Sequence, residues 1–224
     1  MRRTLLVVAK RPAAGQTKTR LCPPLSGAAA AALYECFLLD TLDIMRQAPG
    51  VERGIVYLPD DAEQYFRTLA PDMALTPQRG ADLGERLDHL LTEALTGGAD
   101  QAVVIDSDSP TLPAAYVAGA FALLDGAVDV VLGPCDDGGY YLIGLKRPQP
   151  QLLRDVQMST PYVVRDTLAL ADELGLRAAL LPPWYDVDTV AELERLRAEL
   201  VEAPGDVAPR TRAFLKQDSV WTND

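Results

Sequence analysis

Short apolar runs alternate along the chain with longer segments in which apolar residues recur every three or four positions. The short runs predict strands, and they lie at residues 4–9, 53–59, 73–78, 101–106, 128–134, 138–145 and 178–184. The longer segments predict helices, and they lie at residues 27–46, 60–70, 83–95, 115–126, 160–175 and in the later part of 185–200. Strands separated by helices are typical of a mostly parallel sheet covered on both faces. The sequence therefore predicts an α/β fold.

The pattern is continuous enough to predict a single domain. No internal repeat or linker divides the chain, and 224 residues suffice for one large core. We expect the domain to span residues 1–201, and residues 202–224 to form a C-terminal extension. In open sheets of this kind, ligands bind beyond the carboxyl ends of the strands. The residues that follow strands are therefore the candidates for function.

Composition narrows the range of partners. Hydrophobic residues make up 48% and charged residues 24%, as in ordinary soluble globular proteins. The net charge of -11 argues against a broad nucleic-acid-binding surface, which needs clustered Lys and Arg. No apolar run has the length of a membrane span, and the three cysteines lack the spacing of a zinc site. We expect a cytoplasmic protein without nucleic acid or membrane as a partner.

The loop after the first strand concentrates positive charge in this acidic chain. Its sequence, KRPAAGQTKTR, holds Lys10, Lys18 and Arg20 around Gly15. Glycine allows a tight turn, backbone amides and Lys can bind phosphate oxygens, and Arg can bind them through two parallel hydrogen bonds. The spacing is neither that of a Walker A loop nor that of a dinucleotide fingerprint. The loop predicts a site for nucleotide phosphates, with a solvated basic turn as the alternative.

Two carboxylates lie at the carboxyl end of the strand at residues 101–106. In the stretch VVIDSDSPTLP, Asp106 and Asp108 are separated by one residue, so they lie on the same side of an extended chain. Carboxylate oxygens suit Mg²⁺ or Mn²⁺, and such an ion can bridge the phosphates of a nucleotide. In the alternative interpretation, one of the two acids caps the next helix or stabilises the Ser-Pro turn.

Two further strand ends carry acids. The stretch GPCDDGGYYLIGL places Asp137 directly before Gly138 and Gly139, whose backbone permits the close approach of a ligand. Tyr140 can stack or hydrogen-bond, whereas a simple hairpin turn is the alternative. The stretch YDVDTVAEL places Asp188 before a helix, where it is either a second metal ligand or a helix cap.

The motifs KRPAAGQTKTRL, QRGADLGERL, DSDSPTLP, GPCDDGGYYLIGL and DVDT, in this order, resemble those of bacterial GT-A-like nucleotide-diphospho-sugar transferases. Members of that family are known as glycosyltransferases, and some are linked to arsenosugar biosynthesis. The resemblance covers nearly the whole chain and implies one Rossmann-like GT-A domain. More distantly, the first loop and DVDT are similar to those of 2-phospholactate guanylyltransferases and molybdenum-cofactor nucleotidyltransferases.

The resemblance implies roles for individual residues. The expected catalytic residues are Lys18, Arg20 and Asp137. The nucleotide site would consist of Lys10, Gly15, Lys18 and Arg20 for the phosphates, together with Gln78, Gly80, Leu83 and Gly84 around the base. The acceptor or sugar would face Asp137, Gly138, Gly139 and Tyr140.

The same resemblance implies a Mg²⁺ or Mn²⁺ ion on Asp108 and Asp188. This chain departs from the family's pattern at two positions. Asp106 stands where the family usually carries Gly, so Asp106 is either an added metal ligand or a solvated acid. Met158 stands where a Trp often precedes the sequence Ser-Thr, which changes the wall on the acceptor side.

Three functions are consistent with these motifs. In glycosyl transfer, a metal on Asp106 and Asp108 would neutralise the leaving nucleoside diphosphate while an acceptor attacks the sugar carbon. In nucleotidyl transfer, Lys18 and Arg20 would stabilise the departing pyrophosphate. The third function, a non-catalytic nucleotide-binding module, is disfavoured by the surplus of carboxylates at strand ends. The resemblance favours glycosyl transfer, with a nucleotide or nucleotide-sugar and a small-molecule acceptor as partners.

Overall fold

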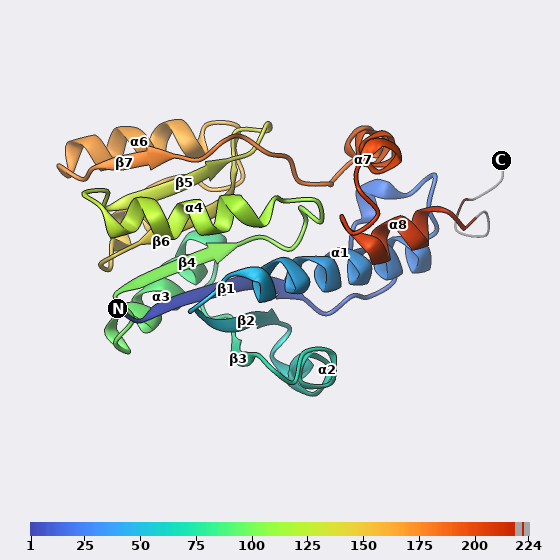
Figure 1. Cartoon of the computed structure of the whole chain (residues 1–224), viewed down its shortest axis with the longest axis horizontal. Helices are drawn as coiled ribbons and strands as arrows, with labels where there is room; N and C mark the ends of the chain where they lie inside the picture. Colours follow the sequence, from blue (N-terminus) through green and yellow to red (C-terminus); the bar gives the residue numbers. More distant parts are fainter. Residues whose placement is uncertain (218–220, 222–224) are drawn as a thin grey trace.

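A seven-stranded sheet forms the centre of the molecule in a computed structural model that describes residues 1–217 and residue 221 (Figure 1). The strand order is β3-β2-β1-β4-β6-β5-β7. Strand β6 runs antiparallel to β4 and β5, and the other pairs are parallel. The strands are β1 (Arg3–Lys10), β2 (Glu52–Leu58), β3 (Ala74–Pro77), β4 (Gln101–Ile105), β5 (Val130–Pro134), β6 (Tyr140–Leu145) and β7 (Ala178–Leu180). The prediction of an α/β fold with a mostly parallel sheet is confirmed.

Helices lie on both faces of this sheet (Figure 1). The α-helices are α1 (Gly27–Gln47), α2 (Glu63–Leu69), α3 (Leu83–Thr96), α4 (Ala114–Asp125), α5 (Pro150–Arg154), α6 (Val163–Glu173), α7 (Val190–Glu202) and α8 (Pro209–Leu215). Two short 3-10 helices are η1 (Thr19–Leu21) and η2 (Asp60–Ala62). The helical periodicity predicted α1, α3, α4, α6 and α7, and it predicted η2 and α2 as one helix. It did not predict α5 or α8.

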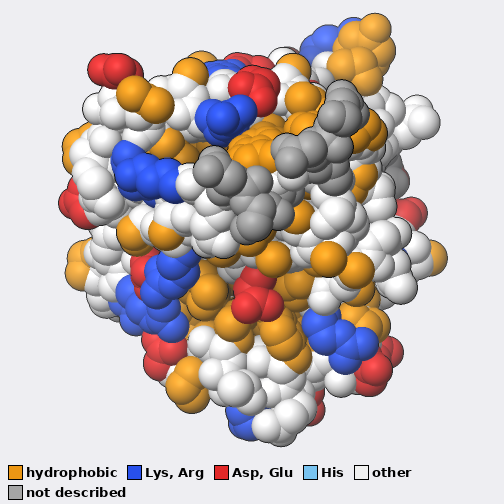
Figure 2. All heavy atoms as spheres, turned by 90° about the vertical axis from the view of Figure 1, so that its right-hand side faces the viewer, with side chains coloured by type: hydrophobic (Ala, Val, Ile, Leu, Met, Phe, Trp, Pro, Cys, Tyr) orange, Lys and Arg blue, Asp and Glu red, His pale blue; other side chains and the backbone are white. Residues whose placement is uncertain are grey.

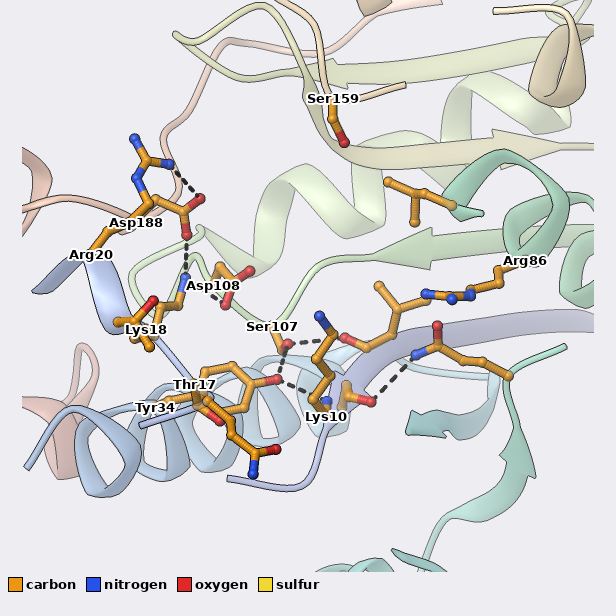
Figure 3. Close-up of a pocket in the computed structure, with 16 residues that line it drawn as sticks. Lys10, Thr17, Lys18, Arg20, Tyr34, Arg86, Ser107, Asp108, Ser159 and Asp188 are labelled. Atoms are coloured by element: carbon orange, nitrogen blue, oxygen red, sulfur yellow. Dashed lines mark hydrogen bonds and ion pairs between the residues drawn. The ribbon is translucent and has the colours of Figure 1, made fainter. Parts of the chain in front are cut away.

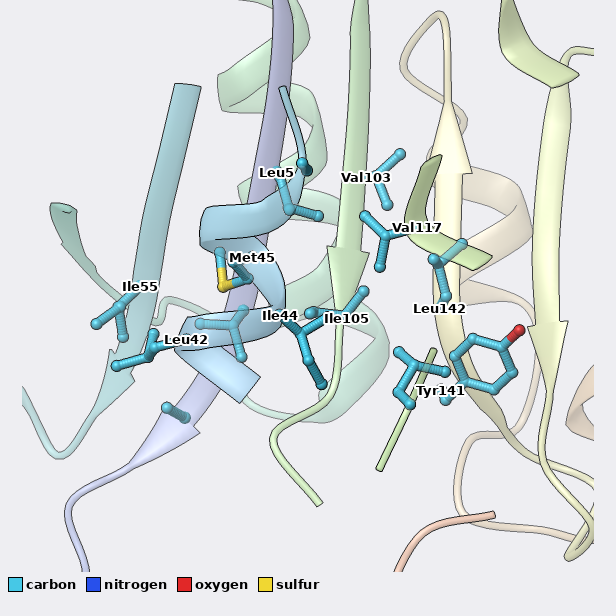
Figure 4. Close-up of a cluster of buried hydrophobic side chains, with 14 of the residues drawn as sticks. Leu5, Leu42, Ile44, Met45, Ile55, Val103, Ile105, Val117, Tyr141 and Leu142 are labelled. Carbon is cyan, nitrogen blue, oxygen red and sulfur yellow. The ribbon is translucent and has the colours of Figure 1, made fainter. Parts of the chain in front are cut away.

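Alternate residues of β4 belong to opposite layers of the core. Val103 and Ile105 pack with residues of α1, α2 and α4, in the cluster that Figure 4 shows. Ala102 and Val104 pack with residues of α3, α5 and α6 on the other face. Burying a Val or Ile side chain contributes about 1.5–3 kcal/mol, so the sandwiched strand anchors both layers. This burial on both faces explains why the strand has a continuous apolar run.

The C-terminal helix α8 packs against α1. Asp40 of α1 is buried, and its carboxylate accepts hydrogen bonds from the backbone nitrogens of Arg210 (3.2 Å) and Thr211 (2.9 Å). The carboxylate thereby satisfies N–H groups that the first turn of a helix leaves free. Helix α7 ends at Glu202, one residue past the predicted end of the domain at residue 201. The division into a domain and an extension itself stays a prediction.

Charge is mixed on the face that carries α7 and α8. Figure 2 shows Lys and Arg side chains interspersed there with Asp and Glu, around apolar side chains near the centre of the view. Among the residues that the structure describes, no helix combines the length and the apolarity that crossing a membrane requires.

Candidate functional site

Two cavities that share a wall open beyond the carboxyl ends of β1 and β4. The first cavity has a volume of about 480 Å³ and the second of about 660 Å³. Four cations line the first cavity, Lys10, Lys18, Arg20 and Arg86, and of these Lys18 and Arg86 line it alone (Figure 3). Acids and a thiol distinguish the second, whose wall includes Asp106, Cys135, Asp137 and Asp186. The residues common to both include Lys10, Arg20, Asp108 and Asp188.

The loop after β1 is a tight turn that its own hydrogen bonds hold. The carbonyl of Ala13 accepts from the backbone nitrogens of Gln16 and Thr17, each at 3.0 Å. The hydroxyl of Thr17 in turn accepts from the nitrogen of Ala13, also at 3.0 Å. Gly15 has a φ of 73°, which a glycine adopts without strain. The structure thus places Gly15 within the turn and outside the walls of both cavities.

Lys18 reaches from this turn to the two carboxylates predicted as metal ligands. Its Nζ lies 2.8 Å from Oδ1 of Asp108 and 2.5 Å from Oδ1 of Asp188, and its side chain is only 7% exposed (Figure 3). Burial by itself lowers the pKa of Lys18, but the charges of Asp108 and Asp188 outweigh burial and raise the pKa above its ordinary value. Arg20 is more open, with a side chain 68% exposed and Nη1 3.5 Å from Oδ2 of Asp188.

Asp106 lies in the wall of the second cavity but also stabilises the turn after β4. Its carboxylate accepts hydrogen bonds from the hydroxyl of Ser109 (2.9 Å) and from the backbone nitrogen of Asp108 (3.3 Å). Burial, and after it the charge of Asp108, raises the pKa of Asp106 well above its usual range. These two hydrogen bonds support the interpretation that Asp106 stabilises the turn, and its role as a metal ligand stays a prediction.

A cluster of Cys135, Asp137 and Asp186 faces the second cavity. One ligand atom from each of the three residues lies within 4.8 Å of the others. Burial and then the charges of Asp188 and Asp137 raise the pKa of Asp186 to about 6. Burial and the charge of Asp106 likewise raise the pKa of the Cys135 thiol. Burial is the main cause of both shifts and the neighbouring carboxylates add to it, so a bound cation would relieve the electrostatic part.

The glycine pair after β5 serves close packing and a turn. Gly138 has a φ of 90°, and a Cβ there would lie 2.0 Å from the carbonyl oxygen of Pro161. The backbone nitrogen of Gly139 donates to Oδ1 of Asp137 at 2.8 Å. Tyr140 lies in the wall of the second cavity, and its hydroxyl donates to the sulfur of Met158 at 3.7 Å. Asp137, Gly139 and Tyr140 therefore face the cavity, whereas Gly138 contacts the chain before α6.

The residues predicted around the base divide into two groups. Gln78 and Leu83 line the first cavity, and the side-chain nitrogen of Gln78 donates to the carbonyls of Val56 (3.0 Å) and Ala9 (3.4 Å). Gly80 and Gly84 lie outside the walls of this cavity. A Cβ on Gly84 would lie 2.2 Å from a carbonyl oxygen of α5, so this glycine lets α3 and α5 pack closely.

Three residues of the first cavity were missed by the sequence analysis. Arg86 lies within α3 and donates to the carbonyl of Gly80 at 3.1 Å, which supports the loop before the helix. The hydroxyl of Tyr34 accepts from the backbone nitrogen of Lys10 (3.1 Å) and lies 2.8 Å from the hydroxyl of Ser107. Burial raises the pKa of Tyr34 to about 12. The available signals were an Arg inside the motif QRGADLGERL and a Tyr within the long helix α1, and neither is specific.

Comparison with known proteins identifies similar structures and the family of this chain. The seven-stranded, mostly parallel sheet matches the Rossmann-like fold of a solved structure described as that of a nucleotide-diphospho-sugar transferase. A protein from Desulfovibrio desulfuricans, provisionally described as a nucleotide-diphospho-sugar transferase, is 32% identical, with a TM-score of 0.90 over 98% of this chain and 96% of its own. The bacterial family described as "Uncharacterized protein conserved in bacteria (DUF2064)" matches residues 41–160. This chain belongs to that family.

More distant structures share the fold alone. CMP:2-keto-3-deoxy-manno-octonic acid synthetase, solved with CTP, is 14% identical, with a TM-score of 0.60 over 90% of this chain and 99% of its own. A Mycobacterium tuberculosis protein, solved with manganese, is 17% identical, with a TM-score of 0.54 over 88% of this chain and 98% of its own. No curated protein matches the sequence.

Proposed function

We propose that this protein is a metal-dependent transferase that moves a glycosyl group from a nucleotide-diphospho-sugar to a small-molecule acceptor. The observation that carries the proposal is the pair of joined cavities with opposite charge, which meet at Asp108 and Asp188. A nucleotide-sugar fits this arrangement, because its anionic diphosphate suits the cationic cavity and its sugar, which is neutral, can extend toward the acidic one. The likeness to the Desulfovibrio protein supports the same class of reaction.

The cationic cavity provides for the donor's phosphates. Lys10, Lys18 and Arg20 line it, and Gln78 and Leu83 lie on the side where the nucleoside would bind. The exposed guanidinium of Arg20 can turn to a phosphate and bind two of its oxygens. Cations fixed beside the leaving diphosphate stabilise the charge that develops as the sugar departs.

The carboxylates at the junction fit a hard dication. Asp108 and Asp188 each present an oxygen to one common point, marked by the Nζ of Lys18. Asp106 would add a third oxygen, and carboxylate oxygens are the ligands that Mg²⁺ and Mn²⁺ prefer. When bound, such an ion neutralises the charge of the leaving diphosphate. The manganese complex of the mycobacterial protein, which shares the fold, is consistent with this assignment.

The acidic cavity provides for the acceptor. Asp137 is exposed, and one of its carboxylate oxygens accepts from Gly139, which orients the side chain in the cavity. In the proposed step, an acceptor hydroxyl attacks the anomeric carbon while the bond from that carbon to the diphosphate oxygen breaks. Asp137 takes the hydroxyl proton, and the nucleoside diphosphate leaves with the bonding electron pair.

Nucleotidyl transfer is the second candidate, and one observation favours it. Lys18 is a buried cation on the loop after β1, well placed to balance departing pyrophosphate. In this reaction a substrate phosphate would attack the α-phosphorus of a nucleoside triphosphate, as in a guanylyltransferase, and pyrophosphate would leave. Several cytidylyltransferases share the fold at 11–15% identity.

Product analysis separates the candidates. The protein is incubated with Mn²⁺, candidate acceptors and either a panel of nucleotide-diphospho-sugars or a panel of nucleoside triphosphates, and the nucleotides are separated by anion exchange. Release of nucleoside diphosphate from a nucleotide-sugar is the expected outcome. Release of pyrophosphate would replace glycosyl transfer by nucleotidyl transfer. Nucleotide binding without any turnover would indicate a non-catalytic module.

A further inference from the structure

The place between Asp108 and Asp188 holds a cation that belongs to the protein itself. The ammonium of Lys18 lies 2.8 Å from one carboxylate and 2.5 Å from the other, and its side chain is 93% buried (Figure 3). Mg²⁺ binds carboxylate oxygens at 2.0–2.1 Å, so the ammonium and a dication would need nearly the same point. Two cations at such a separation repel strongly, because little solvent separates them.

The backbone of Lys18 follows a hydrogen-bonded turn, and its side chain lies between the two carboxylates and the cationic cavity. Lys18 has a φ of 51° and directly precedes η1, after a turn that two backbone hydrogen bonds and the hydroxyl of Thr17 stabilise. From that anchor the side chain contacts the acids, but it also lines the cationic cavity beside Lys10 and Arg20. A phosphate in this cavity would offer the ammonium an anionic partner that replaces the carboxylates.

We propose that Lys18 is an internal counter-ion that occupies the metal position and weakens the binding of a free dication. A dication then binds well only when the phosphates of a donor draw the ammonium away from Asp108 and Asp188. Metal and nucleotide consequently bind with positive coupling, and thermodynamic linkage makes that coupling reciprocal. The inference rests on the proposed function in one respect, which is that Asp108 and Asp188 are the metal ligands.

The test measures Mn²⁺ alone, without nucleotide. Free Mn²⁺ is titrated by electron paramagnetic resonance against the wild type, Lys18→Met and Lys10→Met. Met keeps the length of the side chain and removes its charge. Lys10 lines the same cavity but forms no ion pair with the two acids in the part of the chain that the structure describes, so Lys10→Met controls for the general loss of positive charge. We expect Lys18→Met to bind Mn²⁺ at least tenfold more tightly than the wild type, and Lys10→Met to change the affinity less than threefold.

Two further variants keep the result interpretable. Lys18→Gln retains an amide donor for the carboxylates, and it replaces Lys18→Met if the Met variant does not fold by circular dichroism. Adding Asp188→Asn to the neutral Lys18 variant should remove the gain, because it deletes one of the proposed ligands.

Equal Mn²⁺ affinity in the wild type and the neutral Lys18 variants would overturn the inference. So would an equal gain in Lys10→Met, or a gain that persists with Asp188→Asn. The Mn²⁺ titration needs no turnover, so its outcome does not depend on whether product analysis detects the proposed reaction. Tight Mn²⁺ binding with no product would support the counter-ion and refute the proposed reaction.

Discussion

The two cavities lie at the same edge of the sheet and carry opposite charge. The first is built from the loop after β1 and the start of α3, and cations line it. The second is built from the turn between β5 and β6, the chain before α6 and Asp186, and carboxylates dominate its charge. The whole chain has a net charge of -11. Local charge, rather than net charge, therefore determines where an anionic ligand binds.

The two cavities also differ in how their charges are balanced. The cations of the first cavity are partly neutralised by Asp108 and Asp188, whereas burial, and after it the charges of Asp188 and Asp137, raise the pKa of Asp186 in the second cavity. We infer that the first cavity is prepared for phosphate and that the second requires a cation or a protonated group from the ligand.

Removal of metal is expected to have the largest effect on activity. We expect EDTA to reduce turnover to below about 1% of the untreated value, because a dication contributes several kcal/mol of charge stabilisation in such sites. Transferase assays after dialysis against EDTA measure the loss, and addition of Mn²⁺ or Mg²⁺ serves as the control for reversibility. Full turnover in metal-free buffer would show that the protein's own cations suffice.

Asp137→Asn tests the acidic cavity by itself. We expect kcat to fall about a hundredfold or more, because Asn cannot accept a proton from the acceptor. The amide oxygen of Asn can still accept the hydrogen bond from Gly139, so the turn is preserved.

Asp136→Asn is the matched control for this variant. Asp136 is the neighbouring residue, it is exposed, and it pairs with Arg195 at 2.5 Å instead of lining the two cavities. Its kcat should stay within about twofold of the wild type. An equal loss in both variants would remove Asp137 from the chemistry.

Arg20→Ala tests the cationic cavity. The loss of a charged hydrogen-bonding partner costs about 1.5–3 kcal/mol, so nucleotide affinity should fall roughly ten- to hundredfold. The melting temperature should hardly change, since the side chain is 68% exposed. Calorimetric titration measures the affinity, with Arg11→Ala as control because Arg11 pairs with exposed Asp61 outside the cavities. Unchanged affinity in Arg20→Ala would leave the solvated basic turn as the interpretation.

The smallest expected effect concerns the proton on Asp186. Its folded pKa of about 6 lies above the ordinary value of an aspartate, so protonation stabilises the folded state, and this stabilisation is lost as the pH rises through 6. As the pH rises from 4 to 7, we expect the free energy of unfolding of Asp186→Asn to increase by roughly 1–2 kcal/mol relative to that of the wild type, a range reduced for partial exposure. Urea unfolding in EDTA measures this change. A difference independent of pH would contradict the shift.

Much of the fold could be predicted because the signals are local. All seven strands carry apolar runs, and all of them were predicted. The antiparallel direction of β6 was not predicted, although only residues 135–139 connect it to β5, which is too short for a crossover. Helices α5 and α8 escaped the periodicity because each has fewer residues than the window that reveals a helical face.

Individual residues of the candidate site could be predicted more readily than the contacts between them. The sequence singled out Lys18, Arg20, Asp108 and Asp188 because each lies in a local motif at a strand end, and the structure brings them together, while their roles stay predictions. The position of Lys18 between the two acids was not predicted, since it depends on contacts across the sheet. For the same reason the cluster of Asp186 with Cys135 and the contacts of Tyr34 left no recognisable pattern.

The span of the chain between Lys18 and Asp188 has a consequence for biosynthesis. The two residues are 170 positions apart, and Asp40 and Thr211 of the C-terminal contact are 171 apart. A ribosome adds 5–20 residues per second, so Lys18 is made on the order of ten to thirty seconds before its partner. The site therefore stays incomplete on the nascent chain until Asp188 has been made, and a translation product that stops before Asp188 lacks both one of the two acids that pair with Lys18 and helix α8, which packs against α1.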